Sequence, residues 1–285
     1  MTDLTYFNGE FLPLNEVKIS PLDRGFLFAD GVYEVIPVYN RRPFFLKEHL
    51  NRLYNSLRKI ELKIGIEKNE IKKHVLHLIE KSSYLDQIVY IQITRGVAPR
   101  NHAFPKNIKP TIFIMSSQLI RPSEKNILNG ISAITIEDKR WKSCDIKSVS
   151  LLSNVLAREK AITMNCHESI LVNKENVTEG AASTIWIVNE ATVFCPKPGG
   201  NLLEGIRIQI IEKLCANLGI KFSRNNFKVK ELMSADEVLL TSATKEILAI
   251  TSINGEKIGQ KTTLGKPGSI FKKLRKAYTD LMVSE

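Results

Sequence analysis

Arg140–Ser148 reads RWKSCDIKS, and Lys147 within it lies directly before a predicted helix over residues 151–165. Apolar neighbours at the end of a strand can lower the pKa of a lysine and make its amine a nucleophile. A surface or salt-bridged lysine is the alternative, because the chain carries 41 lysine and arginine residues. Position alone therefore makes Lys147 a candidate and leaves its role open.

Two more groups of polar residues lie on either side of this stretch. Glu179 ends a predicted strand in the sequence VTEG, beside Gly180. Arg100 and His102 stand one residue apart on a predicted loop that contains glycine and proline. Two such donors can clamp a carboxylate. A solvated turn carboxylate and a solvated basic loop are the alternatives for these positions.

The first part of the chain alternates between strand and helix patterns. A hairpin is predicted at the turn Asn8-Gly9, and strands are predicted over residues 31–39, 89–94 and 110–116. Between them, apolar residues recur at helical spacing in two segments. They are Leu46, Leu50, Leu53, Leu57 and Ile60 in one segment, and Ile71, Val75, Leu78 and Ile79 in the other. This pattern predicts an α+β domain over residues 1–117, followed by a polar linker over residues 118–125.

The remaining residues, 126–285, predict a second domain rich in hairpins. Short strand patterns over residues 169–172, 176–179, 184–188 and 192–194 are separated by turns. They indicate a mainly antiparallel sheet or open barrel. A helix is predicted over residues 205–218, with Gly219 as its C-terminal stop. A buried strand over residues 238–240 then ends in Thr241-Ser242-Ala243-Thr244.

Composition narrows the function class. The chain has 43% hydrophobic and 25% charged residues, and no apolar run approaches the roughly 18–20 residues that cross a bilayer. The start does not resemble a signal peptide, so we expect the protein in the cytoplasm, without a membrane partner. The four cysteines form no C-x-x-C pair and no cluster with histidines, so we expect buried thiols and no metal site.

The net charge of +11 makes a nucleic-acid partner worth testing against the sequence. The basic residues are scattered, apart from a cluster at residues 272–276 on a predicted solvated terminal helix. No RNA-recognition motif, zinc knuckle, dinucleotide fingerprint or P-loop occurs. We therefore expect small anionic molecules, and no nucleic acid, as partners.

In order and spacing, several motifs resemble those of the class IV aminotransferases, the fold-type-IV pyridoxal-phosphate enzymes. The matches span nearly the whole chain, and DIKS with VTEG marks the class, while the R-x-H loop with VYEV is similar to its D-amino-acid branch. The matching stretches lie at residues 23–35, 48–53, 94–105, 140–148, 177–180, 203–206 and 241–244.

The resemblance implies a fold and a coenzyme site. The fold is α+β, with a smaller N-terminal α/β sandwich domain and a larger C-terminal, coenzyme-binding domain shaped as an open β-barrel with helices. Pyridoxal 5'-phosphate would be held as a Schiff base by Lys147, which also moves the substrate proton, while Glu179 pairs with the pyridine nitrogen. The remaining coenzyme contacts would come from Arg52, the backbone N–H groups of Ile206 and Arg207, the segment Ser242, Ala243 and Thr244, and Leu203 on the ring face.

The resemblance also implies a substrate site. Tyr33, Arg100 and His102 would bind the carboxylate, with the arginine and the histidine supplied by the partner subunit of a homodimer with shared active sites. The side-chain pocket would be small and apolar, lined by Val35, Pro37 and Ala182. The implied reaction moves an amino group between D-amino acids, D-alanine among them, and 2-oxo acids such as 2-oxoglutarate.

The sequence departs from the family pattern at two places and leaves other reactions open. Alanines replace serines in Ala181-Ala182-Ser183-Thr184, and Ala243 stands where the D-amino-acid branch has a hydroxyl residue. The alternatives are transamination of branched-chain L-amino acids or (R)-amines, aminodeoxychorismate lyase activity, and a basic binding module without catalysis. The Arg100-x-His102 loop argues against branched-chain L-amino acids and against (R)-amines as substrates.

Overall fold

The structure is a computed structural model that describes residues 4–284, so the outermost ends of both expected domains lie outside it. Contacts divide the chain into two compact units. The first contains the described residues up to Ile120 together with Ile146–Ser150, and the second contains Arg121–Asp145 and Leu151–Ser284. The expected boundaries at residues 117 and 126 stay predictions. Ile146–Ser150, which includes Lys147, follows the expected linker in the sequence but packs in the first unit.

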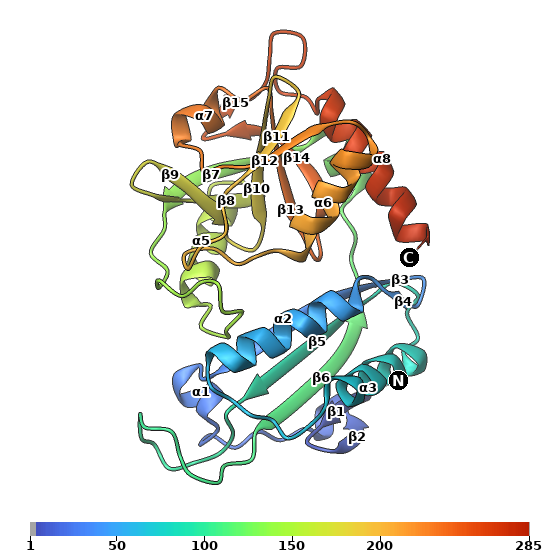
Figure 1. The fold of residues 1–285 in the computed structure, drawn as a ribbon, viewed down its shortest axis with the longest axis vertical. Coiled ribbons are helices and arrows are strands. Elements are labelled where there is room, and N and C mark those ends of the chain that lie inside the picture. Colours follow the sequence, from blue (N-terminus) through green and yellow to red (C-terminus); the bar gives the residue numbers. More distant parts are fainter. Residues whose placement is uncertain (1–3, 285) are drawn as a thin grey trace. The chain divides into compact units, whose positions relative to one another are not determined.

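The first unit contains one antiparallel sheet with its strands in the order β2-β1-β6-β5-β3-β4. In Figure 1, α2 and α3 lie across this sheet. The α-helices and strands are β1 (Leu4–Phe7), β2 (Glu10–Pro13), α1 (Arg24–Phe28), β3 (Gly31–Tyr39), β4 (Arg42–Pro43), α2 (Leu46–Lys59), α3 (Lys68–Lys81), β5 (Gln87–Thr94) and β6 (Thr111–Gln118), and a short 3-10 helix covers Leu14–Glu16.

The core of the first unit lies between these helices and the sheet. The apolar stripe predicted on α2 is confirmed, because Leu50, Leu53 and Leu57 are almost fully buried, while Asn51 and Asn55 between them are exposed. On β3 the even-numbered residues from 32 to 38 are fully buried. Because side chains alternate along a strand, Tyr33 and Val35 project to the opposite face of the sheet.

The second unit is built on a nine-stranded sheet with the order β12-β11-β10-β13-β14-β7-β8-β9, and β15 pairs with β14. Its strands are β7 (Ile131–Glu137), β8 (Glu168–Asn173), β9 (Asn176–Gly180), β10 (Thr184–Asn189), β11 (Thr192–Cys195), β12 (Lys221–Arg224), β13 (Glu237–Ser242), β14 (Glu246–Ile253) and β15 (Glu256–Lys257). Its helices are α4 (Glu124–Asn129), α5 (Leu152–Thr163), α6 (Ile206–Asn217), α7 (Val229–Met233) and α8 (Ser269–Ser284).

This sheet is mixed, and it curls. The pairs β7/β8, β11/β12 and β7/β14 are parallel, while the other pairings are antiparallel. Helices α5 and α6 make two of the parallel joins, because a parallel neighbour requires a crossover longer than a turn. Three residues connect β9 to β10, although β13, β14, β7 and β8 lie between them in the strand order. The sheet must therefore curl into an open half-barrel (Figure 1).

Three details of the second unit test the sequence-based expectations. Gly219 follows α6 with a φ of +65°, as expected for its C-terminal stop. Arg275, expected on a solvated helix, is instead buried and forms an ion pair of 2.6 Å with Glu246. Of the four thiols, that of Cys166 is partly exposed, while the others are buried. None of the helices within residues 4–284 is both long and apolar enough to cross a membrane.

Candidate active site

Lys147 lies on a segment that extends the edge of β3 in the first unit. Ser148 forms an antiparallel bridge with Val32, and the Tyr33 amide donates to the Lys147 carbonyl over 3.0 Å. The Lys147 amide in turn donates to the Ser56 hydroxyl on α2 over 3.2 Å. This pairing places Nζ of the half-buried Lys147 side chain 4.2 Å from the centre of the Tyr33 ring. The structure therefore brings together two residues that the sequence predicted to share a site.

Arg52, the predicted phosphate ligand, is held in a buried ion-pair network. Its Nε and Nη2 atoms donate to the two carboxylate oxygens of Glu34 over 2.7 and 2.9 Å, and His49 Nδ1 lies 2.7 Å from the same group. Burial alone would raise the pKa of Glu34, but Arg52 and His49 hold it well below its ordinary value. The carboxylate is therefore charged, and it fixes the guanidinium in a bidentate geometry.

Arg100 and His102 lie on the irregular loop between β5 and β6, and both are exposed. Their side chains meet at Phe28, the last residue of α1. The Arg100 guanidinium lies 5.2 Å from the centre of the Phe28 ring, and the His102 ring lies 5.2 Å from it. The two predicted carboxylate ligands thus share one aromatic support.

Glu179 is the last residue but one of β9 in the second unit; it is almost fully buried and accepts a hydrogen bond from Arg140. Arg140 also donates to both oxygens of Asp138, over 2.9 and 2.8 Å, and Thr178 donates to Asp138 over 2.7 Å. Burial would lower the pKa of Arg140, but Asp138 and Glu179 raise it above its ordinary value. Arg140 is thus a permanent cation beside Glu179.

Glu179 also lines a cavity that is partly open to solvent, with about 300 Å³ of space not filled by protein atoms. Leu203, predicted to pack on the coenzyme ring, lines the same cavity, as does Ile208 on α6. The other lining residues are Thr178, Thr184, Pro196, Pro198, Leu202 and Glu204. The cavity is therefore mostly apolar, with one carboxylate at Glu179 and another at Glu204.

Helix α6 begins two residues after Glu204, with Gly205 at its N-cap position. Glycine supplies no capping side chain, and none caps this helix. Because the first amides of a helix point along its axis, those of Ile206 and Arg207 form a candidate anion site. The Arg207 side chain itself is buried, and its Nε lies 3.3 Å from the Tyr278 hydroxyl.

Glu168 joins the two loops in which the sequence departs from the family pattern. This fully buried carboxylate accepts from Ser183 over 2.9 Å and pairs with Lys245 at 2.8 Å. The Lys245 amide donates to the Ser242 hydroxyl over 3.0 Å. The loop after β9 and the loop after β13 therefore both bind the Glu168 carboxylate, the first through Ser183 and the second through Lys245.

The alanines in these loops differ in environment. Ala181 is buried against Ala157 and accepts a hydrogen bond from Asn154, so its methyl group belongs to the core. Ala182 is exposed, as a residue of the predicted side-chain pocket needs to be. Val35 is partly buried, and Pro37 is buried. Membership of Val35, Pro37 and Ala182 in one pocket stays a prediction.

Comparison with known proteins gives the class of this chain. A family model described as amino-transferase class IV matches residues 31–253. The chain belongs to the class IV aminotransferases, and it is therefore a transferase enzyme. The D-alanine aminotransferase of Staphylococcus haemolyticus is 37% identical to it over 280 residues, which cover 98% of each chain. That of Bacillus licheniformis is 36% identical over 98% of this chain and 97% of its own.

Solved structures share the fold. The branched-chain amino acid aminotransferase of Escherichia coli matches with a TM-score of 0.91 at 22% identity, over 99% of this chain and 95% of its own. The enzyme of the same name from T.th., complexed with N-(5'-phosphopyridoxyl)-L-glutamate, also has a TM-score of 0.91, at 21% identity, over 100% of this chain and 95% of its own. The expected α+β fold of type IV with two sheets is thus confirmed.

The sequence did not predict the charged residues that form ion pairs with the predicted site residues Arg52 and Glu179. Glu34, Asp138 and Arg140 lie within or near the quoted motifs, but a sequence does not show which charges are buried together. The spacing Asp138-x-Arg140 beside a β-rich run is a weak signal for such a pair. The partners come from different elements, because Glu34 on β3 pairs with α2, and Arg140 in the loop after β7 pairs with Glu179 on β9.

Proposed function

We propose that this protein is a pyridoxal-phosphate-dependent D-amino-acid aminotransferase. It moves an amino group between D-amino acids such as D-alanine and 2-oxo acids such as 2-oxoglutarate, in the cytoplasm. The observation that carries the proposal is the 37% identity to a D-alanine aminotransferase over 98% of both chains. The branched-chain enzymes are similar at 21–22% identity, a likeness of fold that does not bear on the substrate.

The donor set of the two units fits pyridoxal phosphate. Lys147 offers an amine beside an aromatic ring, and Glu179 offers a charged carboxylate in an apolar cavity with Leu203. Arg52 and the first amides of α6 offer cationic and dipolar sites for a phosphate, and Ser242 and Thr244 add hydroxyl groups. An amine can bind the aldehyde of the coenzyme, a carboxylate its pyridine nitrogen, and cationic and N–H donors its phosphate.

When bound, the coenzyme supplies an electron sink that stabilises negative charge on the substrate Cα atom. Lys147 would hold the coenzyme covalently and then move the proton between the substrate Cα atom and the coenzyme carbon C4′. Glu179, kept beside Arg140, would hold a proton on the pyridine nitrogen. Leu203 would exclude water from one ring face.

Arg100, His102 and Tyr33 would bind the substrate carboxylate through a guanidinium, an imidazole and a phenol. A fixed carboxylate and a fixed ring plane leave Lys147 on one face of the substrate. Only one enantiomer can then direct its Cα hydrogen at Lys147 with its side chain in the pocket. By similarity to the D-alanine aminotransferases, that enantiomer is D.

We also propose a homodimer in which the partner subunit supplies Arg100 and His102. On α5, the side chains of Leu152, Val155 and Leu156 are 60–72% exposed. Their spacing of three and four residues puts them on one face of the helix. An exposed apolar stripe of this kind supports burial against a second copy of the chain.

The decisive experiment is a single half-reaction followed by absorbance. The purified holoenzyme is mixed with D-alanine, L-alanine, L-leucine or a simple amine, and loss of the coenzyme aldehyde form is recorded. We expect rapid conversion with D-alanine and negligible conversion with L-leucine. Preference for L-leucine would move the protein to the branched-chain group, and equal use of amines without a carboxylate would exclude the proposed carboxylate site.

A further inference from the structure

Two buried arginines share one carboxylate oxygen next to the loop that carries Arg100 and His102. Arg24 begins α1 and Arg95 follows β5, and both residues are 3% exposed. The Nε atom of each lies 2.8 Å from Oδ2 of Asp30. One negative charge thus faces two buried positive charges. The remaining N–H groups of both guanidinium ions must therefore find other acceptors.

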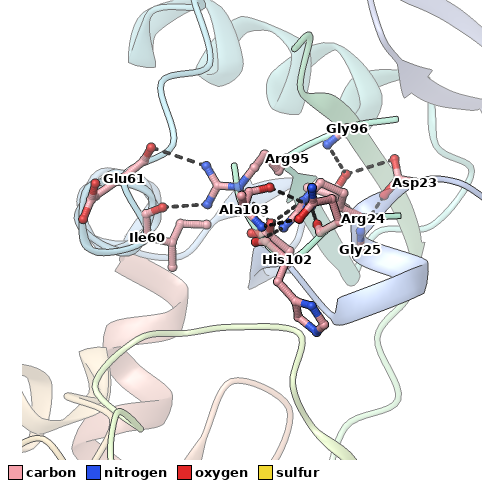
Figure 2. Close-up of polar contacts among 12 residues, drawn as sticks. Asp23, Arg24, Gly25, Ile60, Glu61, Arg95, Gly96, His102 and Ala103 are labelled. Carbon is pink, nitrogen blue, oxygen red and sulfur yellow. Dashed lines mark hydrogen bonds and ion pairs between the residues drawn. The ribbon is translucent and has the colours of Figure 1, made fainter. Parts of the chain in front are cut away.

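The acceptors differ between the two arginines (Figure 2). Arg24 donates through Nη1 to the carbonyls of Asn101 and Ala103, the latter over 3.4 Å, and through Nη2 to the carbonyl of His102 over 3.3 Å. Three consecutive carbonyls of the loop thus converge on one guanidinium.

Arg95 donates to the end of α2 instead. Its Nη2 and Nη1 atoms contact the carbonyls of Ile60 and Glu61 over 2.7 and 3.4 Å (Figure 2). The two arginines are therefore matched in burial and in their ion pair with Asp30, but their remaining hydrogen bonds reach different segments. Arg24 donates to the backbone of the loop, whereas Arg95 donates to the end of a helix and contacts the loop only at the Phe104 side chain, whose ring centre lies 3.6 Å from its guanidinium.

Besides these bonds to Arg24, the Ala103 amide donates to Asn101 Oδ1 over 3.1 Å, and the Phe104 ring packs on the Arg95 guanidinium. Residues 99–104 contain no helix or strand, and the side chains from Arg100 to Phe104 are exposed. Phe28 links the loop to α1 a second time, because the guanidinium of Arg24 lies 4.8 Å and that of Arg100 5.2 Å from its ring centre. His102 stacks at a tilt on the same ring. Arg24 thus orders the backbone between the two exposed side chains and supports the ring they share.

We propose that Arg24 is a positioning residue for substrate recognition, because it sets the backbone from which Arg100 and His102 project. The inference rests on the proposed function, in which these two residues bind the substrate carboxylate. Lysine cannot replace Arg24. A single ammonium group has three donors and cannot contact Asp30 and three separate carbonyls at once, whereas the planar guanidinium has five donors in a fixed arrangement.

The test compares the wild-type holoenzyme with Arg24→Lys and Arg95→Lys. Both variants keep the positive charge and lose a guanidinium from the same ion pair, so both should unfold at a lower temperature. Arg24→Lys should raise KM for D-alanine about 10- to 100-fold, the factor expected for lost charge-assisted hydrogen bonds, while kcat and coenzyme content change far less. Arg95→Lys should leave KM for D-alanine close to that of the wild type.

A second measurement does not depend on turnover. Hydrogen exchange of the backbone amides at residues 100–103 should accelerate in Arg24→Lys and stay at the wild-type rate in Arg95→Lys. Equal changes of KM in both variants would reduce Arg24 to a structural role and overturn the inference. Unchanged exchange in Arg24→Lys would overturn it as well.

The same experiment separates the two proposals. If the wild type converts D-alanine and Arg100→Ala raises its KM, the proposed function stands. An unaltered KM for D-alanine in Arg24→Lys would then overturn the positioning role of Arg24 and leave the proposed function in place. If the wild type does not convert D-alanine, the proposed function fails, and the recognition role of Arg24 fails with it.

Discussion

Arg140 donates to Glu179 and at the same time to both oxygens of Asp138, so one guanidinium joins two carboxylates of the second unit. Burial and the two carboxylates act in opposite directions on the pKa of Arg140, and the carboxylates prevail. A cation that cannot lose its proton keeps a negative charge on Glu179 favourable in an apolar cavity. This is the arrangement required by a carboxylate that holds a proton on a heterocyclic nitrogen.

Replacing Glu179 with glutamine should slow transamination without releasing the coenzyme. Glutamine keeps the shape of the side chain but removes the charge that would favour a protonated pyridine nitrogen. We expect kcat to fall on the order of a hundredfold, the scale of losing one electrostatic contact to a reacting group. Stopped-flow half-reactions with D-alanine measure this rate, and the phosphate content of the purified variant is the control. Turnover at the wild-type rate would reduce Glu179 to a turn carboxylate.

Lys147→Ala should fold, yet it should lose the visible absorbance of the bound coenzyme and nearly all turnover. The backbone pairing of this segment with β3 uses main-chain groups, which alanine retains. Circular dichroism checks the fold, and reduction with borohydride followed by mass spectrometry locates any covalent adduct. An adduct that survives in this variant would refute the role of Lys147. Lys142→Ala, on the same stretch but exposed, serves as the matched control.

Glu34→Gln should destabilise the protein most at neutral pH. It leaves the charge of Arg52 and the buried His49 without their carboxylate, a loss of about 3 kcal/mol on the scale of broken buried pairs. Because the folded-state pKa of Glu34 is depressed, its contribution is present above the ordinary pKa of about 4.3 and disappears as the pH falls through the folded value.

The difference in melting temperature between wild type and Glu34→Gln should therefore narrow as the pH is lowered from about 6 to about 3. Thermal unfolding followed by circular dichroism across this range measures it. Glu70→Gln, at a half-exposed carboxylate on α3, is the control. A difference that does not change with pH would contradict the charged network.

Arg100→Ala should weaken substrate binding by about 1.5–3 kcal/mol, the range for a hydrogen bond to a charged group. Coenzyme content should not change. The signature is selectivity, since D-alanine and D-glutamate should be affected and amines without a carboxylate should not. Steady-state KM values for the two classes of substrate provide the measurement. An equal loss for both classes would show that Arg100 does not recognise a carboxylate.

The sequence predicted the elements of the fold better than the contacts among their charges. The buried stripe of α2 followed from the spacing of its leucines, and the end of α6 followed from Gly219, because periodicity and backbone freedom are local properties. The parallel pairs β7/β8 and β11/β12 were not predicted, since hairpin patterns do not show which strands meet across a helix. Burial of Arg275 was missed for the same reason, as its partner Glu246 lies on β14.

The candidate site divides in a similar way. Lys147, Glu179 and Arg52 stand in motifs and were predicted, by resemblance, with their roles. Arg24, Asp30 and Arg95 also stand in motifs, but their function depends on which carbonyls they reach across the fold. Every residue has a backbone carbonyl, so the type of the accepting residue does not show that it accepts such a hydrogen bond. Such contacts are invisible until the chain is folded.

The strand-like pairing of Ile146–Ser150 with β3 has a consequence for how this polypeptide can be made and divided. During synthesis, residues Gly31–Tyr33 of β3 are made before the segment Ile146–Ser150 with which they pair. Their backbone groups therefore stay unpaired on that side until this segment has been synthesised. A fragment cut after Ile120 would present unpaired amides and carbonyls at Gly31–Tyr33, which invites strand addition and aggregation. Residues up to Ile120 alone therefore lack one strand-like segment of the first unit. A single cut in the chain cannot separate the two units, because Ile146–Ser150 of the first unit lies between two parts of the second.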